Sequence, residues 1–181
     1  MAASPNTLAP TDRLNGVPVS QCLGLVDAVR SNPDVGQTRW RSSTTWKGGF
    51  SCESRIRDHV VQLDEPEALG GTNLAPNMVE AVLAAYGSCL TVGYTLNAAI
   101  RGIEVRSLTV DVEGHIDLAG FFGLSKDVPA GFSSITTTVH LDADASAEQL
   151  ADLHRHVLAT SPVGSILERP IDVTTNLVTT Q

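Results

Sequence analysis

The chain has 181 residues, the length of one ordinary domain, and is long enough to bury a core without metals or disulfides. Apolar residues make up 42% and charged residues 18%, which is typical of a globular protein and excludes a disordered or fibrous one. The formal net charge of −8 would repel nucleic acids and anionic membranes, so we expect neither as a partner.

The cysteines, Cys22, Cys52 and Cys89, lie far apart and form no Cys-x-x-Cys pair. A sparse, odd set favours a reducing cytoplasm over a secreted disulfide framework. The first ten residues also lack the basic segment and apolar run of a signal peptide, so we expect a cytoplasmic protein. The five histidines are not spaced with the cysteines as zinc ligands usually are, and we expect no metal or other cofactor.

The first segment is predicted to be separate from the main fold. Residues 1–16 are rich in Ala, Ser, Pro, Thr and Asn, which indicates a loose arm. A short amphipathic helix should follow and end at Asn32-Pro33, because apolar residues recur at helical spacing at Val19, Cys22, Val26 and Val29. We therefore divide the chain into an arm and helix over residues 1–40 and a domain over residues 41–181.

Strands are expected between Thr38 and Asp64, with Gly48-Gly49 as the turn or bulge between two of them. Strand alternation puts one set of side chains on one face (Phe50, Cys52 and Ile56) and a charged set on the other (Glu53, Arg55 and Arg57). From Asp64 to Asn73 the proline and glycine content predicts a loop that folds tightly.

The most distinctive stretch runs from Pro76 to Gly102, and Ala81 to Ile100 contains no charged residue. That length raises the question of a membrane span, but several polar side chains argue against insertion, among them Tyr86, Ser88, Thr91 and Asn97. A helix that is apolar on all sides belongs inside a protein core or between two subunits. We predict a buried central helix that carries Cys89 and ends at Arg101-Gly102.

Two half-buried strands are predicted next, at Ser107 to His115 and Ile135 to Leu141, with a loop between them. A final strand is predicted over Ile171 to Val178. The order strands, helix, strands, helix, strand indicates an α+β fold with antiparallel sheets.

The second main helix should begin at a capping box formed by Ser146 and Gln149. Its inward residues are expected to be Leu150, Leu153, Val157 and Leu158. Ser161 falls near this inward face as the helix ends at Pro162.

At these positions the sequence resembles the OsmC/Ohr family, in a branch that lacks the family's second cysteine. The resemblance covers roughly Trp46 to Val173 and rests on several linked motifs in order. These are Asp64-Glu65-Pro66, Gly70-Gly71, Asn77 to Glu80, Leu83 to Thr91, Ala98 to Glu104, Val112 to Leu118, Gly120 to Ser125, and Ser161-Pro162-Val163.

The resemblance implies an OsmC-like fold, in which antiparallel sheets wrap around two central helices in an intertwined homodimer. It also implies a site at the subunit interface, where a cysteine at the position of Cys89 attacks an organic hydroperoxide and becomes a sulfenic acid. In the peroxidase members a second cysteine then forms a disulfide with it, and an external thiol reduces that bond.

The sequence departs from this pattern in three places. Ser161 stands where the second cysteine would be and cannot form a disulfide. Phe50 follows Gly48-Gly49 where peroxidase members have an arginine, so the nearest candidates are Arg55 and Arg57. Glu80 precedes Cys89 by nine residues, which turns the two to opposite sides of a straight helix, and its position in the first turn also favours an interaction with the helix dipole.

Two hypotheses remain open. The first is a single-cysteine peroxidase in which Cys89 reacts, Glu80 and Arg57 assist, and an external thiol is the reductant. Because apolar surroundings disfavour a thiolate, this reading needs a cation beside Cys89. The second is a non-redox module that binds a small apolar ligand or a partner at the dimer interface, with Cys89 as a buried small side chain.

Overall fold

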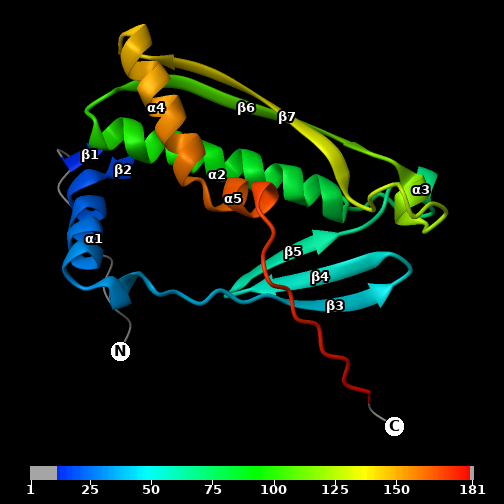
Figure 1. Ribbon diagram of the computed structural model, residues 1–181. Coiled ribbons are helices and arrows are strands. Elements are labelled where there is room, and N and C mark those ends of the chain that lie inside the picture. Colours follow the sequence, from blue (N-terminus) through cyan, green and yellow to red (C-terminus); the bar gives the residue numbers. More distant parts are fainter. Residues whose placement is uncertain (1–11, 180–181) are drawn as a thin grey trace.

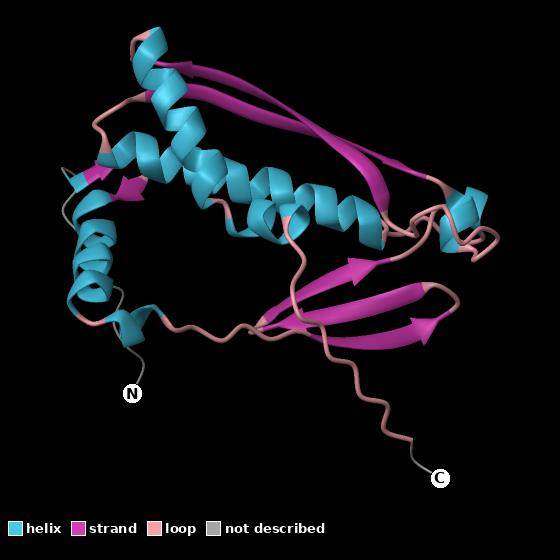
Figure 2. Ribbon diagram, in the orientation of Figure 1, coloured by secondary structure: helices cyan, strands magenta, loops and turns pink. Residues whose placement is uncertain are grey.

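The computed structural model describes residues 12–179 and confirms a mixed fold of helices and antiparallel sheets (Figures 1 and 2). The longest helix, α2 (Met78–Ile100), runs through the body of the molecule. A long hairpin of β6 (Val105–Ile116) and β7 (Phe132–Ala143) lies along it, and α4 (Ala147–Thr160) crosses it. A short helix, α5 (Pro162–Glu168), follows α4 and also contacts α2.

Helix α2 begins and ends where the sequence predicts. Asn77 accepts a hydrogen bond from the Glu80 N–H at 2.8 Å, and the Glu80 carboxylate accepts one from the Asn77 N–H at 2.8 Å, which completes a capping box. The chain leaves the helix at Gly102, whose φ of +72° is a conformation that glycine adopts without strain.

Only one side of α2 is buried within the single chain, although the sequence predicts burial all round. The buried residues are Gly87, Leu90, Tyr94, Ala98 and Ala99, whereas Val82 and Val92 are exposed. By length and composition α2 is long and apolar enough to cross a bilayer, a test that the core helix of a soluble protein also passes.

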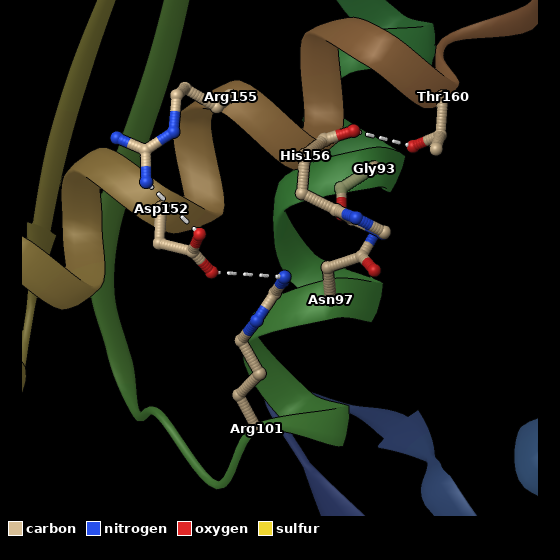
Figure 3. Close-up of polar contacts among 7 residues, drawn as sticks. All are labelled: Gly93, Asn97, Arg101, Asp152, Arg155, His156 and Thr160. Atoms are coloured by element: carbon tan, nitrogen blue, oxygen red, sulfur yellow. Dashed lines mark hydrogen bonds and ion pairs between the residues drawn. The ribbon is translucent and has the colours of Figure 1, made fainter.

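The core lies where α2 meets α4. Leu153 and Val157 of α4 are fully buried against Leu90 and Tyr94 of α2. The two helices approach closely at Gly93, where an added Cβ would lie 2.9 Å from the Val157 Cγ1 atom. At the edge of this contact Arg101 and Asp152 form an ion pair at 3.5 Å, and Arg155 donates a hydrogen bond to Asp152 (Figure 3).

The β6–β7 hairpin confirms the two predicted strands, both longer than expected. Its register pairs Leu108 with Leu141 and Val110 with Val139, so these side chains share the half-buried face toward α2. Between the strands the chain forms one short helix, α3 (Leu118–Phe121). Helix α4 begins at the predicted capping box, but Leu158 is exposed rather than inward.

The three-stranded antiparallel sheet contains β3 (Ser43–Gly48), β4 (Ser51–Ile56) and β5 (His59–Leu63). The predicted turn at Gly48-Gly49 is confirmed. Arg57, however, does not lie on a strand, because it starts the tight β4–β5 turn with a φ of +55°. Non-glycine residues seldom adopt this conformation, and the turn contains no Gly or Asn to signal it.

The N-terminal part has more structure than predicted. Residues 1–11 of the expected loose arm lie outside the described residues, but β1 (Arg13–Leu14) and β2 (Val17–Pro18) form a small hairpin. The predicted amphipathic helix is confirmed as α1 (Val19–Ser31), followed by a 3-10 turn at Pro33–Gly36. The division of the chain at residue 40 stays a prediction.

At the C-terminal end the structure adds one helix and lacks one predicted strand. Helix α4 does end just before Pro162, as predicted, but Pro162 also begins a further short helix, α5, that was not predicted, because proline suits the first position of a helix. The predicted strand from Ile171 to Val178 is absent, since residues 170–179 are extended and pair with no strand of the described chain. An alternating sequence forms a strand only where a neighbour supplies hydrogen bonds, and Val173 here is 77% exposed.

Candidate functional site

The loop before α2 wraps around the buried carboxylate of Asp64. This carboxylate accepts hydrogen bonds from the Thr72 hydroxyl, the Thr72 N–H at 3.0 Å and the Leu74 N–H at 3.3 Å. The Thr72 hydroxyl, helped by the backbone donors and opposed by burial, lowers the pKa of Asp64 below its usual 3.8. The predicted tight loop therefore fixes the start of α2 through Asp64.

Cys89 lies near the middle of α2, is half-buried, and faces the junction between α4 and α5. Its sulfur is 3.4 Å from the hydroxyl oxygen of Ser161, a residue 72 positions later in the sequence. Ser161 is 6% exposed, and its hydroxyl oxygen accepts a hydrogen bond from the Gly164 N–H at 3.1 Å. With a thiol at Cys89 either group can donate across this contact, whereas with a thiolate only the Ser161 hydroxyl can donate, and its proton is free to do so because the Gly164 amide uses a lone pair of the oxygen.

Glu80, the predicted carboxylate partner, is held at the first turn of α2 by the capping box. Nine residues of helix separate it from Cys89 by about 13.5 Å along the axis and half a turn around it. The structure thus places Glu80 in its helix-capping role and does not bring it beside Cys89 within one chain.

Neither candidate arginine forms a hydrogen bond or ion pair with Cys89 within the described residues of the single chain. Arg55 lies 3.6 Å from the Glu53 carboxylate and is exposed. Arg57 is exposed in the β4–β5 turn, and its side chain makes no ion pair or hydrogen bond with the residues that the structure describes. Of the three predicted catalytic residues, Glu80 caps its helix and Arg57 has no side-chain partner among the described residues. Only Cys89 has a polar contact relevant to catalysis, and its partner is Ser161.

A pocket of about 370 Å³ opens between β7 and α5, and neither Cys89 nor Ser161 lines it. Tyr86, Phe132, Ile135 and Leu167 contribute aromatic and aliphatic side chains to its wall. Gly164 also lines it, and an added Cβ there would lie 3.1 Å from the Ser161 hydroxyl oxygen. The wall also contains Ser133, Thr137 and Glu168, so the pocket is mixed in character, and Gly164 is its nearest link to Ser161.

A larger groove of about 1010 Å³ runs along the other side of α2, against β6 and the loop before the helix. Ser88 and Thr91 line it, but Cys89 does not. Glu80 and Asp111 add carboxylates to its wall, so the groove is mixed in character. This groove and the cysteine thus lie on different faces of α2.

One polar contact in the core could not be read from the sequence pattern. The buried hydroxyl of Tyr94 forms a hydrogen bond with Nδ1 of His154 on α4, and burial raises the pKa of Tyr94. A tyrosine inside an apolar helix signals the need for such a partner, but the pattern does not say which residue supplies it. No group of three or more metal-ligating side chains gathers within residues 12–179.

The sequence model of the OsmC family, described as OsmC-like protein, matches residues 71–176, which include α2, Cys89 and Ser161. The chain belongs to the family of OsmC-like proteins. The family predicted from the sequence motifs is therefore confirmed. A comparison with curated protein sequences finds no match.

Solved structures show that the OsmC-like fold is shared at low sequence identity. An OsmC-like protein from Mycoplasma pneumoniae is 16% identical, with a TM-score of 0.64 over 73% of this chain and 89% of that one. An OsmC-like protein of unknown function from Vibrio cholerae is 13% identical, with a TM-score of 0.61 over 73% and 95%. An organic hydroperoxide resistance protein from Legionella pneumophila is 16% identical, with a TM-score of 0.55 over 73% and 92%.

Proposed function

We propose that this OsmC-like protein is a thiol-dependent peroxidase that reduces organic hydroperoxides through the single reactive residue Cys89. The observation that carries the proposal is the 3.4 Å contact between the Cys89 sulfur and the anchored hydroxyl of Ser161. A hydroxyl that donates to sulfur stabilises developing negative charge there, which favours the nucleophilic form. The hydroperoxide resistance protein of Legionella pneumophila supports the same class of substrate.

The proposed reaction has two halves. The Cys89 thiolate attacks the outer oxygen of the hydroperoxide, the O–O bond breaks, and the products after proton transfer are a sulfenic acid and an alcohol. An external thiol then attacks the sulfenic sulfur, forming a mixed disulfide and releasing water. A second external thiol displaces Cys89 and leaves as the disulfide of the reductant. Ser161 cannot replace the first external thiol because it carries no sulfur.

We further propose that the working form is a homodimer. The β3–β5 sheet packs against no helix of the described chain as closely as β6 packs against α2, and Trp46, Val60 and Val61 of this sheet are exposed. The accessible surface is 13577 Å², against about 8400 Å² for a compact protein of this mass. A second copy that covers the sheet and the open side of α2 would account for both features.

The dimer also offers the missing cation. Arg57 is exposed, and the described chain gives its guanidinium no partner. We propose that Arg57 of one copy lies beside Cys89 of the other, where a permanent positive charge would favour the thiolate. In a reducing cytoplasm, which we propose as its location, low-molecular-weight thiols would then complete the cycle.

A turnover assay tests this function. The protein is mixed with cumene hydroperoxide and excess dithiothreitol, and peroxide loss is followed with wild type, Cys89→Ser and Cys52→Ser. Cys52 is a matched control, because it is also a free, half-buried cysteine. We expect Cys89→Ser to lose turnover and Cys52→Ser to keep it. Equal turnover in all three, no faster than free cysteine, would contradict the proposal.

The second candidate is a non-redox module that binds a small apolar ligand, and the groove along α2 favours it. This groove is the larger hollow, Cys89 does not line it, and Leu83, Val92 and Val110 are among its apolar residues. In that case peroxide would be consumed no faster than by free cysteine. Substitution of Val92 by Asp would abolish binding of an environment-sensitive apolar dye.

A further inference from the structure

The pocket of about 370 Å³ between β7 and α5 has no part in the proposed reaction, since Cys89 does not line it. Its walls come from α2, β7 and α5 of a single chain, so the pocket does not depend on the proposed homodimer. Its volume lies within the range of about 300–1,000 Å³ that is usual for small-molecule sites. We call it the β7–α5 pocket.

Two aromatic rings form walls of this pocket, and each ring packs on a glycine. Tyr86 of α2 lies against Gly164 of α5, where an added Cβ would be 3.2 Å from the tyrosine Cε2 atom. Phe132 of β7 lies against Gly114 of β6, where an added Cβ would be 2.6 Å from the phenylalanine Cε1 atom. Neither glycine has a positive φ, so the backbone conformation does not require glycine at either position. The two glycines instead leave room for the rings, which fixes the aromatic walls without a ligand.

The pocket also contains one carboxylate, that of Glu168 at the end of α5. This carboxylate is exposed and forms no ion pair or hydrogen bond with the residues that the structure describes. The basic neighbour Arg169 is engaged elsewhere, because its guanidinium donates to the Ser165 hydroxyl at 3.1 Å. The negative charge of Glu168 is therefore available to a ligand.

Two hydroxyl groups complete the polar part of the wall. They belong to Tyr86 and Thr137, which are both half-buried. Neither hydroxyl forms a hydrogen bond within residues 12–179. A hydroxyl oxygen can accept a hydrogen bond from an ammonium N–H, so these groups suit the same kind of ligand as the carboxylate.

We propose that the β7–α5 pocket binds a small organic cation, namely a protonated primary amine with an apolar body of about the size of a phenylethyl group. The rings of Tyr86 and Phe132 attract a cation through their negative faces, and Glu168 attracts it by its charge. Ile135 and Leu167 provide aliphatic contacts for the apolar body. An anionic ligand would be repelled by Glu168, and the net charge of −8 also favours the approach of a cation.

Amide NMR titration of the isotope-labelled full chain at pH 7 tests the inference with three probes of similar shape. Phenethylamine is the cation, 2-phenylethanol is its neutral match, and 3-phenylpropionate is an anion. We expect phenethylamine to bind about tenfold more tightly than 2-phenylethanol, and 3-phenylpropionate to bind more weakly than either. Glu168→Gln should lower the affinity for phenethylamine about fivefold and leave that for 2-phenylethanol unchanged within twofold.

Glu148→Gln is the matched control, because Glu148 is also exposed but lies on α4 outside the pocket. It should leave the affinity for all three probes unchanged. The amides that shift with phenethylamine should belong to residues 132–137 and 164–168. Since both substitutions are at exposed side chains, both variants should keep the folded amide spectrum of the wild type.

Three results would overturn the inference. Equal affinities for phenethylamine and 2-phenylethanol would show that the pocket does not select a cation. An equal loss of phenethylamine affinity in Glu168→Gln and Glu148→Gln would mean that the amine responds only to the overall negative charge. With all three probes, an absence of shifts at the pocket amides would mean that the pocket is not a ligand site. None of these results bears on Cys89, so the peroxidase proposal is tested separately.

Discussion

The Cys89 sulfur and the Ser161 hydroxyl oxygen are 3.4 Å apart, although 72 residues of sequence separate them. The contact exists because α4 ends and α5 begins at Ser161, which caps α5 by accepting the Gly164 N–H. The Ser161 side chain therefore has two roles. It caps α5, and its hydroxyl contacts Cys89, the only cysteine on α2.

Removing that hydroxyl should slow the chemistry. We expect Ser161→Ala to react with an organic hydroperoxide about tenfold more slowly than the wild type, which corresponds to about 1.4 kcal/mol. The loss of the α5 cap should also lower the free energy of unfolding by about 1 kcal/mol. Stopped-flow rates and urea unfolding measure the two effects.

Ser146→Ala is the control for that experiment. Ser146 caps α4 in the same way, with its hydroxyl accepting the Gln149 N–H at 3.2 Å, but no contact joins it to Cys89. It should therefore cost similar stability and leave the reaction rate unchanged. Equal slowing in both variants would mean that Ser161 acts only through stability.

A cysteine at position 161 should trap the oxidised protein. We expect Ser161→Cys to form a disulfide with Cys89 after one equivalent of hydroperoxide, because the two side chains already touch and the sulfenic acid reacts with a neighbouring thiol. Non-reducing peptide mapping would show the linked peptides. Their absence, with both cysteines overoxidised separately, would contradict the observed proximity.

The close approach of α2 and α4 predicts a packing effect at Gly93. An added Cβ would meet the stiff, β-branched side chain of buried Val157 at 2.9 Å, so we expect Gly93→Ala to lower stability by about 1–2 kcal/mol despite its better helix propensity. Gly24→Ala on exposed α1 is the control, because its Cβ would meet nothing within 4 Å. That variant should instead gain about 0.5–1 kcal/mol in thermal or urea unfolding.

The Asp64 loop predicts a pH dependence of stability. Because hydrogen bonds lower the pKa of Asp64 in the folded protein, its contribution is fully present above the unfolded value near 3.8 and is lost as the pH falls through the lower folded value. Asp64→Asn should be less stable than the wild type at pH 7, and the difference should shrink below pH 3.8. Urea unfolding at pH 7 and pH 3 measures it, and a difference that grows on acidification would contradict the assignment.

The sequence predicted the elements whose signals are local. The charge-free run and its Gly102 stop defined α2, and the capping box at Ser146 defined α4. Periodicity also put Ser161 on the inward face, where the structure finds it. The resemblance to OsmC-like proteins also identified Ser161 as the residue at the position of the expected second cysteine. It therefore predicted which residue should lie beside Cys89.

The features that the sequence did not predict depend on contacts between distant segments or on turns of unusual composition. The β4–β5 turn at Arg57 carries no glycine, so alternation placed this residue on a strand instead. The segment from Ile171 to Val178 has a strand pattern but no strand partner within residues 12–179, and pairing is not encoded locally. The hydrogen bond from Tyr94 to His154 likewise follows from the crossing of α2 and α4, which no pattern within either helix specifies.

The most direct test of the peroxidase proposal is intact-mass analysis with peptide mapping. Reduced wild type and Cys89→Ser receive a stoichiometric amount of cumene hydroperoxide in the presence of dimedone, which traps sulfenic acids. The account predicts that the trap marks Cys89 alone, rapidly and near neutral pH, and leaves Cys22 and Cys52 unmodified. If Cys89 reacts no faster than free cysteine, its sulfur is not activated by Ser161 or by a second copy, and the peroxidase function is wrong.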